Sequence, residues 1–110
     1  MILFRSEHAA PILEGRKTQT RRLGRKRWNV GAVHQARTRM MDSDSTFAHL
    51  RILAVRRERV AEIDEADAHA EGYDSRESYL EAFARINGID EAPPELEAWV
   101  VRFELATTKE

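Results

Sequence analysis

The sequence predicts a mainly β fold with α-helices (α+β), built as a small curled β-barrel of about five to six strands with two to three flanking helices. Three observations support this prediction. Strand-like segments dominate the first half of the chain, two helical segments follow each other in the second half, and a further strand closes the sequence. A sheet of about five strands with one apolar face tends to curl at this chain length. An open α+β sandwich is the alternative.

The first elements are short. Residues 1–4, "MILF", form an apolar strand, and residues 6–15, "SEHAAPILEG", form a short helix. Pro11 is compatible only with the first turn of that helix, and Gly15 is a natural stop. Residues 17–24, "KTQTRRLG", are polar and rich in threonine, which favours a turn that leads into a strand.

Two longer strands follow. Residues 28–40, "WNVGAVHQARTRM", contain a turn at 29–31 and then alternate between two faces. Residues 41–46, "MDSDST", have the polar composition of a loop. Residues 47–60, "FAHLRILAVRRERV", are expected to form a long strand with an apolar centre.

After residue 60 the spacing of the apolar residues changes from that of strands to that of helices. Residues 64–72, "DEADAHAEG", predict a short helix with Asp64 as N-cap and Gly72 as terminator. Residues 74–88, "DSRESYLEAFARING", predict the clearest helix, capped by Asp74 or Ser75. Its apolar face is formed by Tyr79, Leu80, Phe83 and Ile86, and Gly88 ends it. The last strand, "AWVVRFEL", places Trp99, Val101, Phe103 and Leu105 on one face.

Length and composition exclude several classes of protein. The 110 residues suffice for one domain, 1–110, and the chain has no cysteine, which excludes disulfides, a thiolate nucleophile and a cysteine-based zinc site. No apolar run approaches the roughly 20 residues that cross a bilayer, and the apolar start is too short for a secretory signal. We therefore expect a cytoplasmic protein without membrane contact. The four histidines show no metal-binding spacing, so we expect neither a metal nor a cofactor.

Charge is strongly segregated along the chain. Residues 1–57 contain 13 Lys and Arg against 4 Asp and Glu, whereas residues 58–97 contain 3 against 13. Such a basic half is typical of proteins with polyanionic partners. Alternatively, the two halves neutralise each other within the fold.

The stretch "EGRKTQTRRLGRKR", residues 14–27, concentrates the positive charge. Seven of the twelve residues from Arg16 to Arg27 are basic, and Thr18 and Thr20 lie close behind Lys17. The segment is compatible with a phosphate-binding patch, with a lysine–threonine reaction centre, or with a solvated turn.

The motif "GRKTQTRR", followed by Trp28 and Gly31, resembles the ASCH domain (activating signal cointegrator homology) family. The segment "DEADAHAEGYDSRESYLEAF" is similar to a second block of that family, and "AWVVRFEL" to its final strand. The resemblance covers nearly the whole chain and implies a PUA-like β-barrel. One bacterial branch comprises small amidohydrolases that remove the acetyl group from N4-acetylcytidine, and its lysine, threonine and glutamate match Lys17, Thr20 and Glu71 here.

Chemistry gives these three residues plausible roles. Thr20 supplies a hydroxyl nucleophile, and Lys17 takes its proton if burial and nearby arginines lower the lysine pKa from about 10.4. Glu71 favours charged Lys17 if it lies too near; we expect it to transfer the proton to the leaving amine and to help orient the cytosine. On a regular strand the side chains of residues 17 and 20 point to opposite faces, so a turn or bulge between them is required.

The remaining candidates concern binding of RNA or of a modified nucleoside. Phosphate contacts are predicted for Arg21, Arg22, Arg25, Lys26 and Arg27. Trp28 either stacks on a base or packs in the barrel core. Tyr73 either lines the mouth of a pocket or packs under the helix that follows it. Arg22 also matches the ASCH arginine and can instead anchor the motif loop. Two other functions stay open: a non-catalytic RNA-binding module, and an ASCH-type ribonuclease that uses Lys17. The sequence leaves the oligomeric state undetermined.

Overall fold

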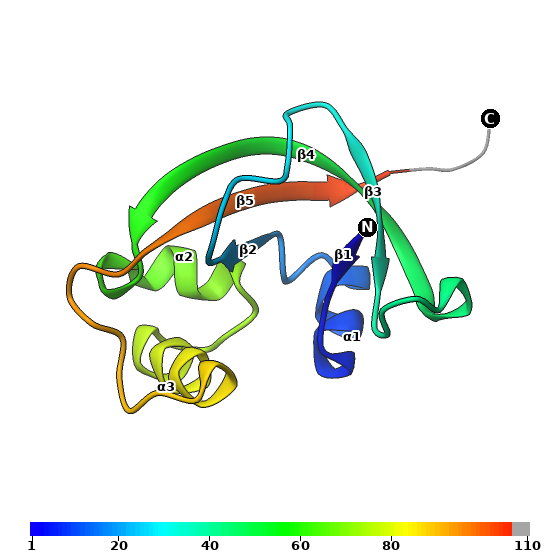
Figure 1. Cartoon of the computed structure of the whole chain (residues 1–110). Helices are drawn as coiled ribbons and strands as arrows, with labels where there is room; N and C mark the ends of the chain where they lie inside the picture. The colour runs from blue at the N-terminus through cyan, green and yellow to red at the C-terminus, as the bar shows by residue number, and fades with distance from the viewer. Residues whose placement is uncertain (107–110) are drawn as a thin grey trace.

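Two long antiparallel strands, β4 and β5, organise the fold (Figure 1). The computed structural model describes residues 1–106. The strands are β1 (Ile2–Leu3), β2 (Gln19–Arg22), β3 (Val33–Arg37), β4 (Thr46–Arg59) and β5 (Glu97–Leu105). The α-helices are α1 (Ala9–Leu13), α2 (Glu65–Ala70) and α3 (Arg76–Asn87), and 3₁₀ turns occupy Ser6–His8, Ser43–Ser45 and Val60–Glu62.

The five strands form one strongly curved sheet in the order β1-β3-β4-β5-β2. β1 pairs in parallel with β3, and the other neighbours are antiparallel. The register between β4 and β5 shifts between Ile52 and Ala54, and a shift of this kind bends a strand and increases its twist. β4 and β5 consequently form an arch, and β1 and β2 are the two edges of the sheet (Figure 1).

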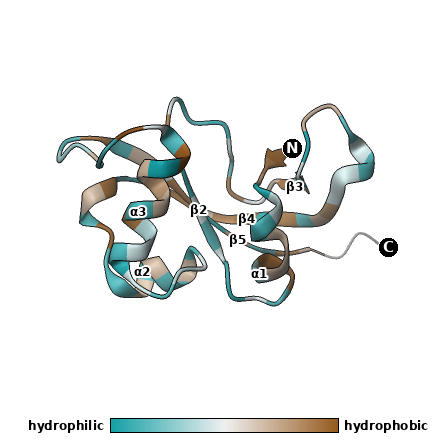
Figure 2. Cartoon of the chain, turned by 90° about the horizontal axis from the view of Figure 1, so that it is seen from below, coloured by the Kyte–Doolittle hydropathy of each residue, from teal (hydrophilic) through white to brown (hydrophobic). Residues whose placement is uncertain are grey.

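All three helices lie on the concave side of this arch. α1 lies beneath one end, whereas α2 and α3 lie beneath the other (Figure 1). Seen from the helix side, α1 is separated from the α2–α3 pair, with β2 between them (Figure 2). This arrangement leaves the segment around β2 flanked by elements from both halves of the chain.

The apolar residues form two clusters. One cluster lies against the sheet and contains Phe4, Trp28, Leu50 and Phe103 among its buried members. The other lies between helices α2 and α3 and the end of the arch above them. It consists of Val60, Ile63, Ala68, Tyr79, Phe83 and Ala98. Ala98 and Val101 of β5 belong to different clusters, so this strand contributes buried residues to both.

The structure confirms the predicted α+β fold with a small curled sheet and three α-helices. Local signals correctly predicted the helix ends: Asp64 caps α2, Ser75 caps α3, and Gly88 adopts the left-handed conformation that ends α3. One detail of the final strand differs. Leu105 is 47% exposed, because it lies at the end of β5, beyond the residues packed into the sheet core.

No helix within residues 1–106 is both long enough and apolar enough to span a membrane.

Candidate functional site

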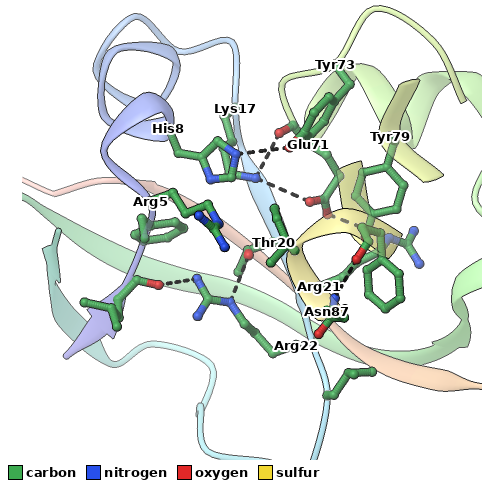
Figure 3. A pocket seen from close by; sticks show the side chains of 15 residues that line it. Arg5, His8, Lys17, Thr20, Arg21, Arg22, Glu71, Tyr73, Tyr79 and Asn87 are labelled. Atoms are coloured by element: carbon green, nitrogen blue, oxygen red, sulfur yellow. Dashed lines mark hydrogen bonds and ion pairs between the residues drawn. The ribbon is translucent and has the colours of Figure 1, made fainter. Parts of the chain in front are cut away.

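A cavity of about 260 Å³ lies where the N-terminal segment, β2 and the α2–α3 region meet. Figure 3 shows the side chains that surround it. The side chains that line the cavity belong to Leu3, Phe4, Arg5, His8, Lys17, Thr20, Arg21, Arg22, Leu23, Glu71, Tyr73, Tyr79, Phe83, Ile86 and Asn87. The three predicted catalytic residues are among them, although more than 50 positions of sequence separate Glu71 from the other two.

Lys17 is held at the cavity by the turn that precedes β2. Its backbone N–H donates to Pro11 O over 3.0 Å, and the next residue, Thr18, donates to Ala70 O over 2.7 Å. Because β2 begins only at Gln19, Lys17 does not follow the strand alternation. The side chains of residues 17 and 20 therefore reach the same cavity, with Lys17 only 2% and Thr20 only 5% exposed. This burial excludes the solvated-turn interpretation.

Glu71 lies at the C-terminal end of α2 and binds Lys17 twice. The Lys17 ammonium donates to the backbone oxygen of Glu71 over 2.9 Å and to Glu71 Oε1 over 3.3 Å. Both side chains are almost completely buried. Gly72 follows Glu71 with a φ of +97°, which favours glycine, and a Cβ at this position would lie in van der Waals contact with Lys17 Cβ, at 3.4 Å.

Burial opposes the charge on both partners of this pair. Loss of water lowers the pKa of Lys17; the Glu71 carboxylate opposes this effect, and the positive charge of Arg22 reinforces it. Burial likewise raises the pKa of Glu71, against the influence of Lys17 and Arg21. The pair is therefore shifted toward its neutral forms, a free amine beside a carboxylic acid. An amine of this kind can accept a proton, and an acid of this kind can donate one.

Arg21 does not lie on a phosphate-binding surface, which corrects one of the predicted roles. Its side chain is fully buried, and its Nη2 lies 2.7 Å from Glu58 Oε1 and 3.2 Å from Asp67 Oδ2. Its Nε lies 3.7 Å from Glu71 Oε2. The guanidinium is thus surrounded by three carboxylates, since a buried charge needs partners. Arg21 thus places a positive charge beside the Glu71 carboxyl group.

Thr20 and Arg22 form a second interaction inside the cavity. Arg22 Nε donates to Thr20 Oγ1 over 3.1 Å, and Arg22 Nη2 donates to Leu3 O over 2.7 Å. The guanidinium also lies over the Phe4 ring, 5.0 Å from its centroid. Within residues 1–106 no hydrogen bond joins Lys17 to Thr20, although both line the same cavity.

The wall opposite β2 is aromatic. Tyr73 and Tyr79 meet edge to face with centroids 5.6 Å apart, and Tyr79 packs next to Phe83. Tyr73 lines the cavity and also packs against the apolar cluster that contains Tyr79, and its hydroxyl lies 3.2 Å from His8 Nε2. Burial is the main reason why the pKa of His8 falls to about 4, with a contribution from the charge of Lys17. His8 is accordingly neutral at pH 7.

His8 and Tyr79 escaped the sequence analysis as site residues. The sequence carries no local signal for His8, because its contact with Tyr73 spans 65 positions. For Tyr79, the helical period correctly indicated burial but not which residues would meet it.

Several solved structures superpose on this chain. The ASCH domain structure from Lactobacillus crispatus superposes with a TM-score of 0.64 at 21% identity, over 88% of this chain and 69% of that one. A protein from Enterococcus faecalis of the DUF984 family superposes with a TM-score of 0.69 at 16% identity, over 96% and 76% of the two chains. A variant of ZmASCH from Zymomonas mobilis gives 0.65 at 16% identity, over 94% and 66%.

The chain has the fold of an ASCH domain. At these identities the likeness concerns the fold alone. The sequence matches no protein-family model, and the search of curated proteins also finds no match. The motif-based prediction of an ASCH-type, PUA-like fold is thus confirmed by three-dimensional similarity, which persists at lower sequence identity than sequence matches do.

Within the ASCH fold, the basic run divides into residues with different environments. Arg25, Lys26 and Arg27 are exposed in the loop between β2 and β3. Trp28, in contrast, is only 6% exposed and belongs to the core cluster with Phe4. Of the two positions left open for Trp28, base stacking and the barrel core, the structure has the core position, because other apolar side chains cover the ring.

No group of three or more histidine, aspartate or glutamate side chains is arranged to hold a metal ion within residues 1–106.

Proposed function

We propose that the protein is an amidohydrolase that removes the acyl group from N4-acetylcytidine or a related modified nucleoside. The observation that carries this proposal is the buried group formed by the Lys17 amine, the Thr20 hydroxyl and the Glu71 carboxyl around one cavity. An activated hydroxyl, a base and an acid are what amide cleavage through a covalent intermediate requires.

In the first half-reaction, Thr20 Oγ1 attacks the acyl carbonyl carbon while neutral Lys17 accepts the hydroxyl proton. Collapse of the tetrahedral intermediate breaks the bond between the carbonyl carbon and N4, and protonated Glu71 transfers its proton to N4 as the cytidine amine leaves. Lys17 is then an ammonium and Glu71 a carboxylate, 3.3 Å apart. Transfer of one proton from Lys17 to Glu71 restores both groups.

In the second half-reaction, water attacks the acyl ester on Thr20. Lys17 accepts a proton from that water and then returns it to Thr20 Oγ1 as the ester bond breaks, which releases the carboxylic acid. The raised pKa of Glu71 and the lowered pKa of Lys17 each shift the group in the direction that its role requires.

The size and walls of the cavity favour a single base as ligand. Its volume of about 260 Å³ falls just below the roughly 300–1,000 Å³ typical of pockets for drug-sized ligands. Tyr73 and Tyr79 supply aromatic surface on one side. A planar nucleobase matches both properties.

Hydrolysis of N4-acetylcytidine, followed by chromatography, tests the proposal. We expect turnover by the native protein and losses of at least about 100-fold in kcat for Lys17→Met, Thr20→Val and Glu71→Gln, because each removes a group that handles a proton or forms a bond. Thr20→Ser keeps a hydroxyl and is expected to retain activity. Arg102→Gln changes an exposed charge outside the cavity and is the matched control. Undiminished turnover in Thr20→Val would contradict the assignment of the nucleophile.

A second candidate function is RNA binding without catalysis. Arg25, Lys26 and Arg27 are exposed, and within residues 1–106 none of them forms a salt bridge. No hydrolysis of acetylcytidine together with salt-sensitive retention of RNA would favour this alternative. Shortening of the RNA in the same experiment would favour a ribonuclease.

A further inference from the structure

Arg22 is the one cationic side chain that contacts the Thr20 hydroxyl within residues 1–106. It extends from β2, one edge of the sheet, to Leu3 of β1, the other edge, which have no backbone pairing with each other. Figure 3 shows its guanidinium beneath Thr20, with dashed lines to both partners. The guanidinium is thus held at two of its nitrogens and by the Phe4 ring.

This contact restricts the Thr20 hydroxyl. A threonine hydroxyl has one hydrogen to donate and two lone pairs to accept with. Since Arg22 Nε–H occupies one lone pair at 3.1 Å, the hydroxyl hydrogen must point away from Arg22. Thr20 lines the cavity, so the directions left to the hydrogen include the cavity where Lys17 lies.

The charge of Arg22 favours the deprotonated form of both Thr20 and Lys17. A fixed cation beside Oγ1 stabilises the negative charge that develops there when the proton leaves. The same cation opposes protonation of Lys17. Transfer of a proton from Thr20 to Lys17 nevertheless creates a new cation near Arg22, and Glu71 compensates for it at 3.3 Å.

We propose that Arg22 is the positioning residue of this site, which holds Thr20 Oγ1 as an acceptor and places a fixed positive charge beside the reacting hydroxyl, on the cavity that Lys17 also lines. This inference rests on the proposed hydrolase function. It assigns to Arg22 a role that its link between β1 and β2 alone does not require.

Two variants separate the electrostatic role from the structural one. Arg22→Gln removes the charge, whereas Arg22→Lys keeps a charge but loses the planar fork that reaches Thr20 and Leu3 together. We expect Arg22→Gln to lower kcat by about 10–100-fold with a smaller change in KM, because the lost interaction forms mainly in the transition state. Arg22→Lys is expected to recover part of that loss.

The pH dependence gives a readout that a purely structural role would not move. The acidic limb of kcat/KM reports deprotonation of Lys17 in the free enzyme. Without the opposing charge, the Lys17 pKa rises, so this limb shifts to higher pH by about 0.5–1 unit in Arg22→Gln and much less in Arg22→Lys. Arg102→Gln, an exposed arginine outside the cavity, is the matched control, in which the limb is expected to stay in place.

Carbon-13 NMR of the lysine Cε groups measures the Lys17 pKa without any substrate. The chain contains three lysines, and Lys17→Met identifies the relevant signal. A rise of the Lys17 pKa in Arg22→Gln supports the inference, and an unchanged pKa overturns it even when the variant is less stable. If the native protein hydrolyses no acetylcytidine, the proposed function fails, while the NMR titration still decides whether Arg22 controls the ionisation of Lys17.

Discussion

Gly72 illustrates at the residue scale how backbone and side-chain constraints meet at the site. It follows α2 with a φ of +97°, and the Lys17 side chain covers the place where a Cβ would lie. Gly24 has a similar φ of +91° but nothing within 4 Å of that place. At Gly72, unlike at Gly24, an added methyl group would therefore contact Lys17.

We predict that Gly72→Ala and Gly24→Ala each lose about 1–2 kcal/mol of unfolding free energy in urea, because alanine is strained at positive φ. Gly72→Ala alone places a methyl group against the Lys17 side chain, so it alone is expected to lower activity. Equal activity of the two variants would show that the close approach at Gly72 has no functional importance.

The buried Lys17–Glu71 pair is a second residue-scale feature. Removing one partner leaves the other buried without its hydrogen-bond partner, whereas removing both leaves neither polar group in the interior. We expect Lys17→Met and Glu71→Gln each to destabilise the protein by about 1–3 kcal/mol. The double variant is expected to lose at least about 1 kcal/mol less than the sum. Urea unfolding of all four proteins measures this difference, and strict additivity would contradict direct coupling.

His8 links the site to pH-dependent stability. Its pKa is about 4 in the folded protein, below the ordinary value of 6.5, so between these values the unfolded chain binds more protons. Its contribution is therefore fully present above pH 6.5 and is lost as the pH falls toward 4. Because His8 is only partly buried, we expect this contribution to amount to about 1–2 kcal/mol.

His8→Phe is expected to weaken the decline of unfolding free energy between pH 7 and pH 4.5. Arg102→Gln, a change at an exposed position outside the cavity, is the control for effects unrelated to His8. Identical pH profiles for the native protein and His8→Phe would contradict the role of His8.

At the scale of elements, α3 determines the aromatic wall of the cavity, and a capping box determines where α3 begins. Ser75 Oγ accepts from Ser78 N over 3.0 Å, and Ser75 N donates to Ser78 Oγ over 3.1 Å. These bonds satisfy backbone and side-chain groups that the first turn of a helix leaves free. Tyr79 and Phe83 then follow on the buried face.

We predict that Ser75→Ala lowers the unfolding free energy by about 1 kcal/mol, measured by urea unfolding. It should also weaken ligand binding, because α3 carries Tyr79 to the cavity. Glu81→Gln, on the exposed side of the same helix, is the matched control. A loss of stability that is equal in both variants would argue against the cap.

At the scale of the whole molecule, charge is partly neutralised between the two halves of the chain. Arg56 and Arg21 of the basic half both pair with Asp67 of the acidic half, and Arg57 pairs with Glu97. The alternative interpretation of the charge pattern is therefore correct for these residues. The exposed cations of the loop at 25–27 remain available for a polyanion.

If this loop binds single-stranded RNA through three phosphates, log affinity should fall against log salt with a slope of about −2. Five contacts, as the sequence alone suggested, would give about −3.5. The variant with Arg25→Gln, Lys26→Gln and Arg27→Gln should lose this binding, and Arg102→Gln, another exposed arginine, should keep it. Binding that persists in the triple variant would place the RNA contact elsewhere.

The helix limits and the order of elements along the chain could be predicted because the signals are local. Asp64, Ser75 and Gly88 act within one turn of their own helix, and the apolar periods of 3.6 and 2 reflect which side of each element is covered. The residues Lys17, Thr20 and Glu71 were predicted from the family motif, and each lies at the cavity.

Tertiary structure alone decided how exposed each basic residue is. Arg21 and Arg25 belong to one basic run in the sequence, yet the first is buried among carboxylates and the second is in solvent. It also brought His8 to Tyr73 and Arg22 to Leu3. The sequence determined the elements and their ends, because those depend on neighbours within a few residues. The environment of each site group depends on segments that meet only when the sheet curves, and no local pattern encodes that meeting.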